Sequence, residues 1–442
     1  MKIKVKVSAT GNARQMKESG YRSIGAIPLT WKLCKIKQYA EVFTGNSIKD
    51  DQKDKYTDAN DAIPYISTKD IDASLQRINY ENGLYVKAND LTFKRVAEQS
   101  TLLCIEGGSA GKKVAFTNRD VCCVNKLCCL HSDGYHNKYL YYYVLSSAFK
   151  NQFDSHISGL IGGVSVNQLK NFIMPFPPYD EQERIATFLD VKCFYINSVI
   201  EKTRESIEEY KKLKQSIITE AVTKGIRPNR EMKDSGIDWI GTIPANWGVQ
   251  RIKTIFSLRN ERNYEALEDV NLISLYTDLG VVQHDDLEKT SGNKASNADG
   301  YKKVKEDDIV VNIILCWMGA VGRSNFDGVT SPAYDVYIPS DSVNSRFYHH
   351  YFRTSGFGGD CYKRGKGIMA MRWRTYSDQF RDIRVVVPPL AEQKEILSYL
   401  DKRTLEIDNL LLKKQQFINE LEDFKRALIY EYVTGKKEVP SC

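Results

Sequence analysis

Four residues near the middle of the chain resemble a catalytic motif. Phe176-Pro177-Pro178-Tyr179 is close to the Asp/Asn-Pro-Pro-Tyr/Phe signature of enzymes that methylate amino groups. Their chemistry needs a side-chain oxygen at the first position, which accepts hydrogen bonds from the target amine. Phe176 offers no such oxygen, and no glycine-rich loop suited to a methyl donor follows an expected strand. The sequence therefore predicts no methyl transfer by this chain.

A glycine-rich turn in the first half of the chain resembles a phosphate-binding loop. Residues 107–113 read Gly-Gly-Ser-Ala-Gly-Lys-Lys. The pattern Gly-x-x-x-x-Gly-Lys-Ser/Thr would need a glycine in place of Glu106 and a hydroxyl in place of Lys113, so nucleotide binding is not predicted. Such a turn can still approach a DNA phosphate closely, and a similar turn precedes Arg323. We expect Lys112, Lys113 and Arg323 to contact DNA; an ordinary surface turn is the alternative.

The densest basic, glycine-punctuated segment outside the long charged stretches spans residues 363–374. Its cations are Lys363, Arg364, Lys366, Arg372 and Arg374. Arginine can read a guanine edge, and both arginine and lysine bind phosphates, so we expect this segment to contact DNA. At the corresponding place in the first half, residues 158–167 carry no basic residue, and backbone amides and small hydroxyls would act there instead. A solvated loop is the alternative.

Two pairs of adjacent cysteines, at residues 122–123 and 128–129, could suggest a metal site. Adjacent residues of a strand point to opposite faces, however, and zinc ligands within a pair are usually separated by two to four residues. The six histidines add no ligand spacing. We therefore expect buried core cysteines and no metal.

The composition is that of a globular protein with room for more than one core. The chain has 442 residues, a formal net charge of +7 and a pI near 8.7, which suits a polyanionic partner without requiring one. No apolar run approaches the roughly 18 residues of a membrane-spanning helix, and the first residues lack a signal-peptide core. Ten cysteines without framework spacing indicate a reducing compartment, so we expect a cytoplasmic protein.

The elements that position these residues are organised around a duplicated stretch. Residues 177–182 (Pro-Pro-Tyr-Asp-Glu-Gln) recur as residues 388–393 (Pro-Pro-Leu-Ala-Glu-Gln), a displacement of 388 − 177 = 211 residues. The similarity continues without a gap and pairs, for example, Lys214 with Lys425. Similarity at a fixed displacement indicates a duplicated structural unit.

Each copy is expected to form one long helix. Two prolines precede it, and Asp180 with Glu183 forms a capping-box pattern in the first copy. Apolar residues then recur about every 3.5 residues, as in a coiled-coil seam. They are Leu189, Ile196, Val199, Ile200, Ile207, Tyr210, Leu213 and Ile217 in the first copy, and Leu400, Ile407, Leu410, Leu411, Ile418, Leu421, Phe424 and Leu428 in the second. At 1.5 Å per residue, roughly 44 residues make a rod of about 65 Å. Two ordinary amphipathic helices are the alternative.

A second repeat, here called the opening motif, stands ahead of each helix. Residues 16–31 contain Met-Lys-Glu-Ser-Gly, then Ile-Gly-Ala-Ile-Pro, and end at Trp31. Residues 232–247 contain Met-Lys-Asp-Ser-Gly, then Ile-Gly-Thr-Ile-Pro, and end at Trp247, a displacement of 232 − 16 = 216. The glycines and prolines predict turns that lead into a short strand or helix. The chain thus consists of an opening motif, a variable body and a long helix, twice over.

The two bodies, about residues 38–176 and 254–387, barely resemble each other in sequence. Both nevertheless carry the same succession of β-rich runs, a basic glycine turn, an aromatic helical run and a glycine-rich segment. The β-rich runs are 102–105, 121–130, 309–315 and 336–338; the helical runs are 139–145 and 347–352; the glycine-rich segments are 156–164 and 356–367. This succession predicts two mixed α/β domains that share a fold but not a specificity.

The doubled Pro-Pro-x-x-Glu-Gln helix, the doubled Ile-Gly-x-Ile-Pro-x-x-Trp motif and the diverged bodies resemble the specificity subunit of type I restriction-modification enzymes. The resemblance covers essentially the whole chain and depends on the doubled order of both motifs. It implies two pseudo-symmetric mixed α/β target-recognition domains, each reading one half of a split sequence in double-stranded DNA. Two long antiparallel coiled-coil helices would separate these domains and dock two modification (methyltransferase) subunits. Whether two restriction subunits complete the complex is left open.

The expected domain boundaries follow from the repeats. They place the first target-recognition domain at residues 1–177, the central helix at 178–227, the second target-recognition domain at 228–387 and the C-terminal helix at 388–442. The resemblance implies a non-catalytic chain without a cofactor of its own, with S-adenosylmethionine, ATP and magnesium on partner subunits. One alternative is a self-contained restriction-methylation enzyme, which the missing catalytic motifs disfavour. Another is a coiled-coil scaffold that does not touch DNA, which the paired basic turns disfavour.

Overall fold

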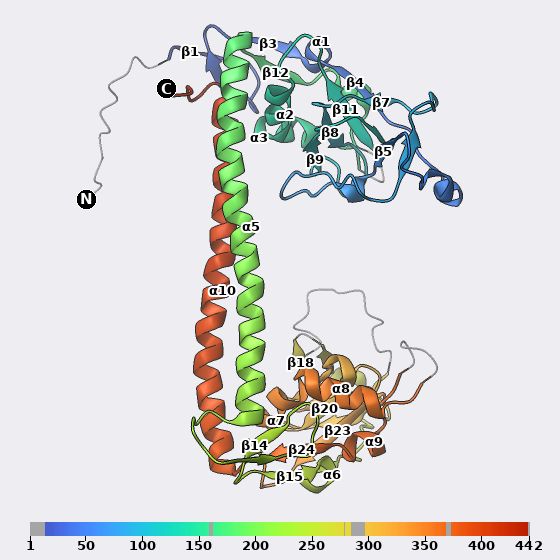
Figure 1. The fold of residues 1–442 in the computed structure, drawn as a ribbon, viewed down its shortest axis with the longest axis vertical. Coiled ribbons are helices and arrows are strands. Elements are labelled where there is room, and N and C mark those ends of the chain that lie inside the picture. Colours follow the sequence, from blue (N-terminus) through green and yellow to red (C-terminus); the bar gives the residue numbers. More distant parts are fainter. Residues whose placement is uncertain (1–13, 159–161, 278, 284–296, 368–372, 441–442) are drawn as a thin grey trace, which may run out of the picture. The chain divides into compact units, whose positions relative to one another are not determined.

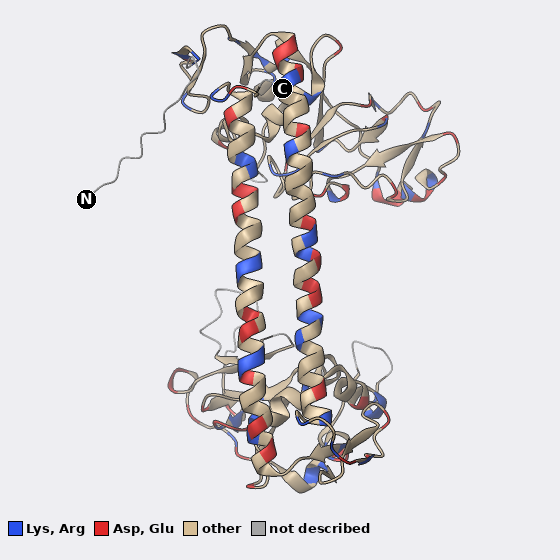
Figure 2. Ribbon diagram, turned by 60° about the vertical axis from the view of Figure 1, so that its left-hand side comes forward, with Lys and Arg blue, Asp and Glu red and all other residues tan. Residues whose placement is uncertain are grey.

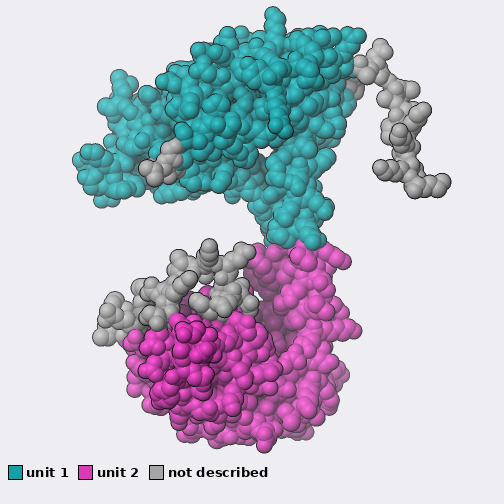
Figure 3. Space-filling model, turned by 180° about the vertical axis from the view of Figure 1, so that it is seen from behind, with its two compact units in different colours: residues 1–204, 415–442 teal, residues 205–414 magenta. Residues whose placement is uncertain are grey.

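The computed structural model describes residues 14–158, 162–277, 279–283, 297–367 and 373–440. The chain divides into two compact units (Figure 3). Unit 1 comprises residues 1–204 and 415–442, and unit 2 comprises residues 205–414. Unit 1 is therefore assembled from both ends of the chain, whereas unit 2 is one continuous stretch. No helix among the described residues is long and apolar enough to cross a membrane.

The body of unit 1 is built from short strands and helices (Figure 1). In chain order these are β1 (Met16–Glu18), β2 (Ala26–Pro28), β3 (Lys32–Lys35), α1 (Ile36–Tyr39), β4 (Glu41–Thr44), η1 (Asp50–Tyr56), β5 (Ala62–Ile66), η2 (Thr68–Asp70), β6 (Tyr85–Lys87), β7 (Arg95–Val96), β8 (Thr101–Cys104), β9 (Val114–Phe116), β10 (Val121–Cys123), β11 (Leu127–His131), α2 (Asn137–Leu145), α3 (Ser147–Ser155), α4 (Val166–Leu169) and β12 (Ile173–Phe176).

The body of unit 2 has a comparable succession. Its elements are β13 (Met232–Asp234), β14 (Thr242–Pro244), β15 (Gly248–Arg251), α6 (Ile252–Ile255), β16 (Phe256–Leu258), η3 (Leu267–Asp269), β17 (Ile273–Tyr276), β18 (Gly280–Gln283), β19 (Lys302–Val304), β20 (Ile309–Asn312), η5 (Cys316–Met318), β21 (Val321–Arg323), β22 (Gly328–Thr330), β23 (Tyr334–Pro339), α7 (Ser345–Phe352), α8 (Ser355–Arg364), α9 (Ser377–Arg381) and β24 (Arg384–Val387).

The two bodies share a sheet topology, as the sequence predicts. The four-stranded sheet of unit 1 has the order β4-β11-β8-β9, and that of unit 2 has the order β16-β23-β20-β21. All neighbouring strands in both sheets are antiparallel. Each unit also pairs the first strand after its opening motif with the last strand of its body, β3 with β12 and β15 with β24. Both bodies are therefore mixed α/β domains built on the same four-stranded sheet. Their other strands differ, because unit 1 has a second four-stranded sheet, of order β6-β5-β10-β7, where unit 2 has the two-stranded sheets β17-β18 and β19-β22.

Two long helices, α5 (Tyr179–Lys224) and α10 (Leu390–Val433), contribute to both units. They run antiparallel within each unit. In unit 1 Arg204 pairs with Glu422 at 3.1 Å, and Lys425 donates to Asn197 at 2.9 Å. In unit 2 the ammonium of Lys214 lies 2.7 Å from the carboxylate of Asp408. Cationic and acidic residues alternate along both helices (Figure 2).

Helix α5 begins one residue before Asp180, the residue predicted to cap it. Helix α5 already begins at Tyr179, so Asp180 lies in the first turn and the predicted capping box is wrong. The carbonyl of Pro178 instead accepts the first hydrogen bond, from the amide of Glu181 at 3.0 Å. Asp180 still lies at the positive end of the helix dipole, where a carboxylate is favourable.

A buried seam joins the helices as predicted, except at four positions. Its buried members include Leu189, Ile196, Ile200 and Ile207 of α5, and Leu400, Ile407, Ile418 and Leu428 of α10. Val199, Leu213, Leu410 and Phe424, which the periodicity also suggested, are exposed. Successive helical residues point about 100° apart, so the seam takes Ile200 and leaves its neighbour Val199 outside.

A carboxylate connects each helix motif to its opening motif. In unit 1 Glu181 accepts hydrogen bonds from the indole of Trp31 at 2.7 Å and from Arg14 at 2.5 Å. In unit 2 Glu392 accepts hydrogen bonds from Arg230. Burial alone would raise the pKa of Glu392, but the hydrogen bonds, led by that from Arg230, outweigh it and lower the pKa. Since 230 − 14 = 216, the opening repeat begins two residues earlier than the sequence analysis recognised.

The neighbouring glutamine connects each helix to the body of its unit. Its amide nitrogen donates to the carbonyl of the first proline of its own motif, at 2.9 Å in both copies. Its amide oxygen then accepts a hydrogen bond from the body: from Tyr39 Oη to Gln182 at 2.5 Å, and from Asn344 N to Gln393 at 2.7 Å. The recurrence of Glu-Gln after Pro-Pro thus has a structural cause.

A lysine beyond or at the end of each long helix holds an opening motif. Lys224 donates to the carbonyl of Ile240 at 2.7 Å in unit 2. Lys436 donates to the carbonyl of Ile24 at 2.6 Å in unit 1. The end of the chain is therefore bound to its beginning within unit 1.

Two ion pairs are buried in the body of unit 2. Arg259 and Asp308 are 7% and 2% exposed, and the guanidinium donates two hydrogen bonds to the carboxylate, at 2.7 and 3.1 Å. Lys302 donates to Asp335 at 2.7 Å. Because a buried charge is costly without its partner, each pair depends on both of its members.

The paired cysteines lie in the core of unit 1. Cys122 and Cys123 pack into two different hydrophobic clusters, as expected for adjacent residues of strand β10. Burial raises the pKa of the two thiols to about 11 and about 12, so both stay neutral at physiological pH. Within the described part of the chain, no group of three metal-binding side chains is placed to hold a metal ion.

Candidate nucleic-acid interface

In unit 1 the predicted DNA-contacting turn connects β8 to β9. Gly107 and Gly111 have φ angles of 84° and 70°, in the left-handed region that favours glycine. A Cβ on Gly111 would also lie only 2.7 Å from the ring of Phe153. The turn is therefore a tight, packed hairpin connection and not the start of a helix, which excludes the nucleotide-binding loop that its sequence resembles.

The two lysines of this turn have different environments. Lys112 is exposed, and its ammonium donates to the carbonyl of Gly108 at 3.1 Å. Lys113 is half-buried and donates to the carbonyl of Thr68 at 2.6 Å. Lys112 is thus available to an external anion, whereas Lys113 fixes the turn to η2.

The structure brings the glycine-rich segment of the first body beside this turn. Gly163 forms isolated bridges with Glu106 and with Ser158, and the amide of Gly107 donates to Gly162 O at 2.9 Å. Residues 159–161 lie outside the described residues. The two segments that the sequence singled out in the first body therefore form one surface.

In unit 2 the predicted contact Arg323 ends strand β21. Its guanidinium donates to Asp307 at 2.5 Å and lies 3.4 Å from Glu306. Burial would raise the pKa of Asp307, but the hydrogen bonds from Arg323 and Ser345 outweigh it and lower the pKa. The positive charge of Arg323 is thus already balanced, and its contact with DNA stays a prediction.

The first part of the glycine-rich segment at residues 356–367 belongs to helix α8. Lys363 and Arg364 lie, exposed, in the last turn of helix α8. Its glycines serve close packing: a Cβ on Gly356 would lie 2.1 Å from the ring of Trp239, and one on Gly358 would lie 2.6 Å from the carbonyl oxygen of Trp317. The sequence alone does not show these tertiary contacts of the glycines.

The remaining basic residues of this segment lie across an isolated bridge. The amide of Lys366 donates to Arg374 O at 2.8 Å, and the amide of Arg374 donates back at 3.0 Å. Lys366 is exposed and Arg374 is half-buried. Arg372 lies outside the described residues. The bridge holds two of the predicted cations at opposed positions, close to the end of α8.

An aromatic stack supports these cations and was missed by the sequence analysis. Tyr362 and Trp373 stack with ring centroids 5.0 Å apart, and Trp317 lies 5.4 Å from Tyr362. The indole of Trp373 donates to the carbonyl of Tyr362 at 3.0 Å. A Cβ on Gly365 would lie 2.2 Å from that indole nitrogen, which accounts for the glycine. The spacing of the three aromatics follows no helical or strand period, so no sequence signal connects them.

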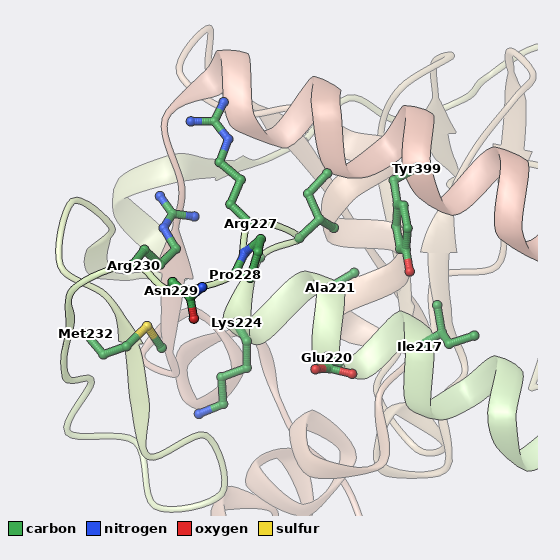
Figure 4. A pocket seen from close by; sticks show the side chains of 12 residues that line it. Ile217, Glu220, Ala221, Lys224, Arg227, Pro228, Asn229, Arg230, Met232 and Tyr399 are labelled. Atoms are coloured by element: carbon green, nitrogen blue, oxygen red, sulfur yellow. The ribbon is translucent and has the colours of Figure 1, made fainter.

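A pocket of about 610 Å³ lies where α5 ends in unit 2 (Figure 4). Lys224, Arg227 and Arg230 line it. The two arginines, however, pair with Glu395 and Glu392, and Lys224 is bound to backbone carbonyls. This basic pocket is neutralised from within and is part of the connection between helix and opening motif.

Comparison with known proteins bears directly on this doubled architecture. The family described as "Type I restriction modification DNA specificity domain" matches residues 28–209, which include the first body and much of α5. The type I restriction enzyme MjaVIII specificity subunit of Methanocaldococcus jannaschii is 22% identical over 93% of this chain and 94% of its own length. Residues 28–209 thus match a type I restriction-modification DNA specificity domain, and the similarity to a specificity subunit extends over most of the chain.

Solved structures show the same fold. A chain from a structure on complex assembly and conformational transition of the type I restriction-modification system has a TM-score of 0.67 at 14% identity, covering 93% of this chain and 99% of that one. The HsdS subunit of Thermoanaerobacter tengcongensis has a TM-score of 0.50 at 16% identity, covering 95% and 100%. The predicted fold class, two mixed α/β domains with two long helices, is confirmed.

Proposed function

We propose that this chain is the non-catalytic subunit that recognises a split DNA sequence in a type I restriction-modification complex. The observation that carries the proposal is one four-stranded sheet that occurs in both bodies beneath different surfaces. The first body presents Lys112 beside a segment without cations, and the second presents a basic helix end. Specificity in DNA recognition comes from side chains that reach base edges, so two such bodies suit two different half-sites.

The DNA-reading surface of each body would be its glycine turn with the segment beside it. In the first body this surface includes Lys112, Lys113 and the backbone amides around residues 158–163. In the second body it includes Arg323, Lys363, Arg364, Lys366, Arg372 and Arg374. The exposed cations would bind phosphates and position the bodies, while arginine can also read guanine. The domains proposed for these roles are residues 1–177 and 228–387.

The long helices would dock the partner subunits. Three positions related by 211 residues are apolar and at least 41% exposed in both helices: Phe194 and Leu405, Val199 and Leu410, Leu213 and Phe424. Exposed apolar residues at equivalent places of a duplicated element suit two copies of one partner. We take these partners to be two modification subunits, which would carry S-adenosylmethionine. Restriction subunits, where present, would carry ATP and magnesium, and the complex would act in the cytoplasm.

The methyltransferase-like motif supports a chain without chemistry of its own. Phe176, at the position that would need an amine-binding oxygen, is the last residue of strand β12. Its ring packs edge-on against Tyr39 and Tyr135, with centroids 5.9 and 5.1 Å apart. The residue is part of an aromatic core and has no polar group to offer a substrate.

Sequencing of modified bases in the host genome tests the proposed function. Deletion of this gene is expected to remove methylation from one split motif, with adenines normally methylated on both arms. Complementation with the intact gene should restore it, while the modification subunit alone should not. Unchanged methylation of every motif in the deletion strain, or methyl transfer by the isolated chain, would contradict the proposal.

The helix pair is also expected to set the distance between the half-sites, proposed to lie about one DNA turn, near 34 Å, apart. Inserting four residues after Lys202, with four more after Glu420 to keep the antiparallel partner in step, adds about 6 Å of helix. At about 3.4 Å per base pair, the unread spacer should lengthen by about two base pairs.

Modified-base sequencing of cells that carry this variant would reveal the new spacer. Four residues inserted after Gly134, in the connection between β11 and α2, provide the control and should leave the spacer unchanged. A helix-insertion variant that methylates with the original spacer would show that the helices do not set it.

A further inference from the structure

A second basic pocket, in unit 1, contains a buried lysine, Lys425, that donates to amide oxygens and forms no ion pair among the described residues. Its volume is about 370 Å³, and it lies where the β8–β9 turn, the loop before β6 and helix α10 meet. Its polar lining includes Ser74, Gln76, Lys112, Lys150, Lys425 and Arg426. The pocket thus joins a predicted DNA-contacting residue of the body, Lys112, to two cations of the long helix.

Lys425 is the buried cation of this pocket, with 6% of its surface exposed. Its ammonium donates to two amide oxygens, Gln76 Oε1 at 2.8 Å and Asn197 Oδ1 at 2.9 Å. An ammonium has three donors, and among the described residues the third has no acceptor. Burial lowers the pKa of Lys425, as expected for a cation whose charge is not fully compensated.

The duplicated helix provides a comparison for this lysine. Lys214 is its counterpart 211 residues earlier, and Asp408 is likewise the counterpart of Asn197. In unit 2 the lysine therefore faces a carboxylate, at 2.7 Å. In unit 1 the same position holds a neutral amide. The exchange of aspartate for asparagine leaves the buried Lys425 without the counter-charge that its twin has.

The surroundings of Lys425 add positive charge. The one carboxylate lining the pocket, Glu422, already pairs with Arg204 at 3.1 Å. Lys150 and Arg426 pair with Asp154 and Asp423 at the exposed surface, where such pairs are weak. The first pocket described above differs at its least exposed cation, because Arg230 pairs directly with the buried carboxylate of Glu392, whereas Lys425 donates to amide oxygens.

We propose that this pocket binds a backbone phosphate of the target DNA, so that helix α10 contacts DNA together with the first body. A phosphate oxygen would accept the third hydrogen of Lys425 and hydrogen bonds from Lys112 and Ser74. This contact carries no sequence information; it fixes the first body and the helix pair on the same strand. The inference rests on the proposed function, since it names a further contact of the same DNA.

A scan with methylphosphonate linkages tests the contact in the assembled complex of this chain with its modification subunits. Each linkage removes one phosphate charge from a DNA carrying the target sequence. The wild type should bind several of these DNAs more weakly than it binds unmodified DNA. For one of these linkages, Lys425→Met should bind the modified and the unmodified DNA equally well, because this variant no longer contacts that phosphate. The logarithm of the binding constant should also fall less steeply with salt in Lys425→Met, by about one unit of slope.

Two further variants keep the result interpretable. Lys112→Gln changes an exposed residue and should fold normally. Its affinity for DNA should be unaffected by the same methylphosphonate linkage that leaves the affinity of Lys425→Met unaffected. Lys214→Gln, at the equivalent place where aspartate balances the charge, should keep the wild-type scan and salt slope. If the wild type, Lys425→Met and Lys112→Gln all lose affinity at the same methylphosphonate linkages, the proposal is overturned.

A free anion is the other source of the same chemistry. One contrary outcome is that inorganic phosphate raises the unfolding temperature of the wild type but not that of Lys425→Met, while both proteins respond alike to every methylphosphonate linkage. That pair of results would assign the pocket to a small anion and overturn the DNA contact. A different result is expected if the chain does not recognise a DNA sequence at all. The complex would then bind all DNA sequences equally, with or without a methylphosphonate linkage. Loss of the phosphate contact alone leaves the methylated motif unchanged.

Discussion

Replacing residues 254–387 by the corresponding body of another specificity subunit is expected to change one half-site completely and to leave the other half-site and the spacer intact. The reason is that the second body forms its own sheet and carries its own basic surface, whereas the glutamine contacts that connect a body to the helices recur in both units. The original motif should lose all methylation, and a hybrid motif should gain it. Modified-base sequencing of cells expressing the hybrid measures both.

The design must preserve the connections to the helices. The donor body should keep a backbone amide that donates to Gln393 and a cation opposite Asp401, which here are the backbone N–H of Asn344 at 2.7 Å and Arg346 at 2.8 Å. The reciprocal exchange of residues 38–176 is the matched control and should alter the other half-site. A hybrid that changes both halves, or a stable hybrid that still methylates the original motif, would contradict the assignment of one half-site to each body.

Asp308→Ala is expected to be among the most destabilising single substitutions in unit 2. It would leave the guanidinium of Arg259, which is 7% exposed, without the carboxylate that accepts two of its hydrogen bonds. Removing one member of a buried ion pair typically lowers the free energy of unfolding by about 3–5 kcal/mol. The exposed Glu261, which also pairs with Arg259, cannot replace a buried carboxylate. Urea denaturation of the purified chain, followed by circular dichroism, measures the loss.

Glu265→Ala is the matched control in the same body. Glu265 pairs with Lys303 at 3.3 Å, and both side chains are exposed. Exposed pairs contribute about 0–1 kcal/mol, so the urea midpoint should hardly move. Equal losses in the two variants would show that the buried position of Asp308 is not what matters.

The sequence predicted most of what repeats. Because the displacement of 211 residues holds without a gap, the starts of α5 and α10 could be placed within two residues, whereas α5 ends at Lys224 and not at 227, and α10 ends at Val433 and not at 442. The shared order of turns and runs indicated two bodies of related fold. The short strands were harder to divide. Residues 121–130 read as one β-rich run, but they form β10 and β11, which belong to different sheets. The turn at residues 124–126 depends on pairing partners far away in the chain.

The site was less predictable because burial decides which cations are available. Arg323 and Lys112 follow similar glycine turns, yet Arg323 meets Asp307 in space and Lys112 meets no carboxylate within the described structure. In the sequence Lys425 stands out only as the counterpart of Lys214, and its burial against the amides of Gln76 and Asn197 is seen only in the structure. A comparison of Asn197 with Asp408 across the repeat was the one sequence signal that could have singled it out.

The assembly of unit 1 from both ends of the chain has a consequence for its biosynthesis. A ribosome releases the first body early, but residues 415–442, which complete its helix pair and hold its opening motif, emerge last. At about 5–20 residues per second, the intervening 210 residues of unit 2 take about 10–40 seconds to make. The body that is translated first is therefore the last to be finished. A nonsense mutation near the 3′ end of the gene would damage the N-terminal body and spare the one encoded next to it.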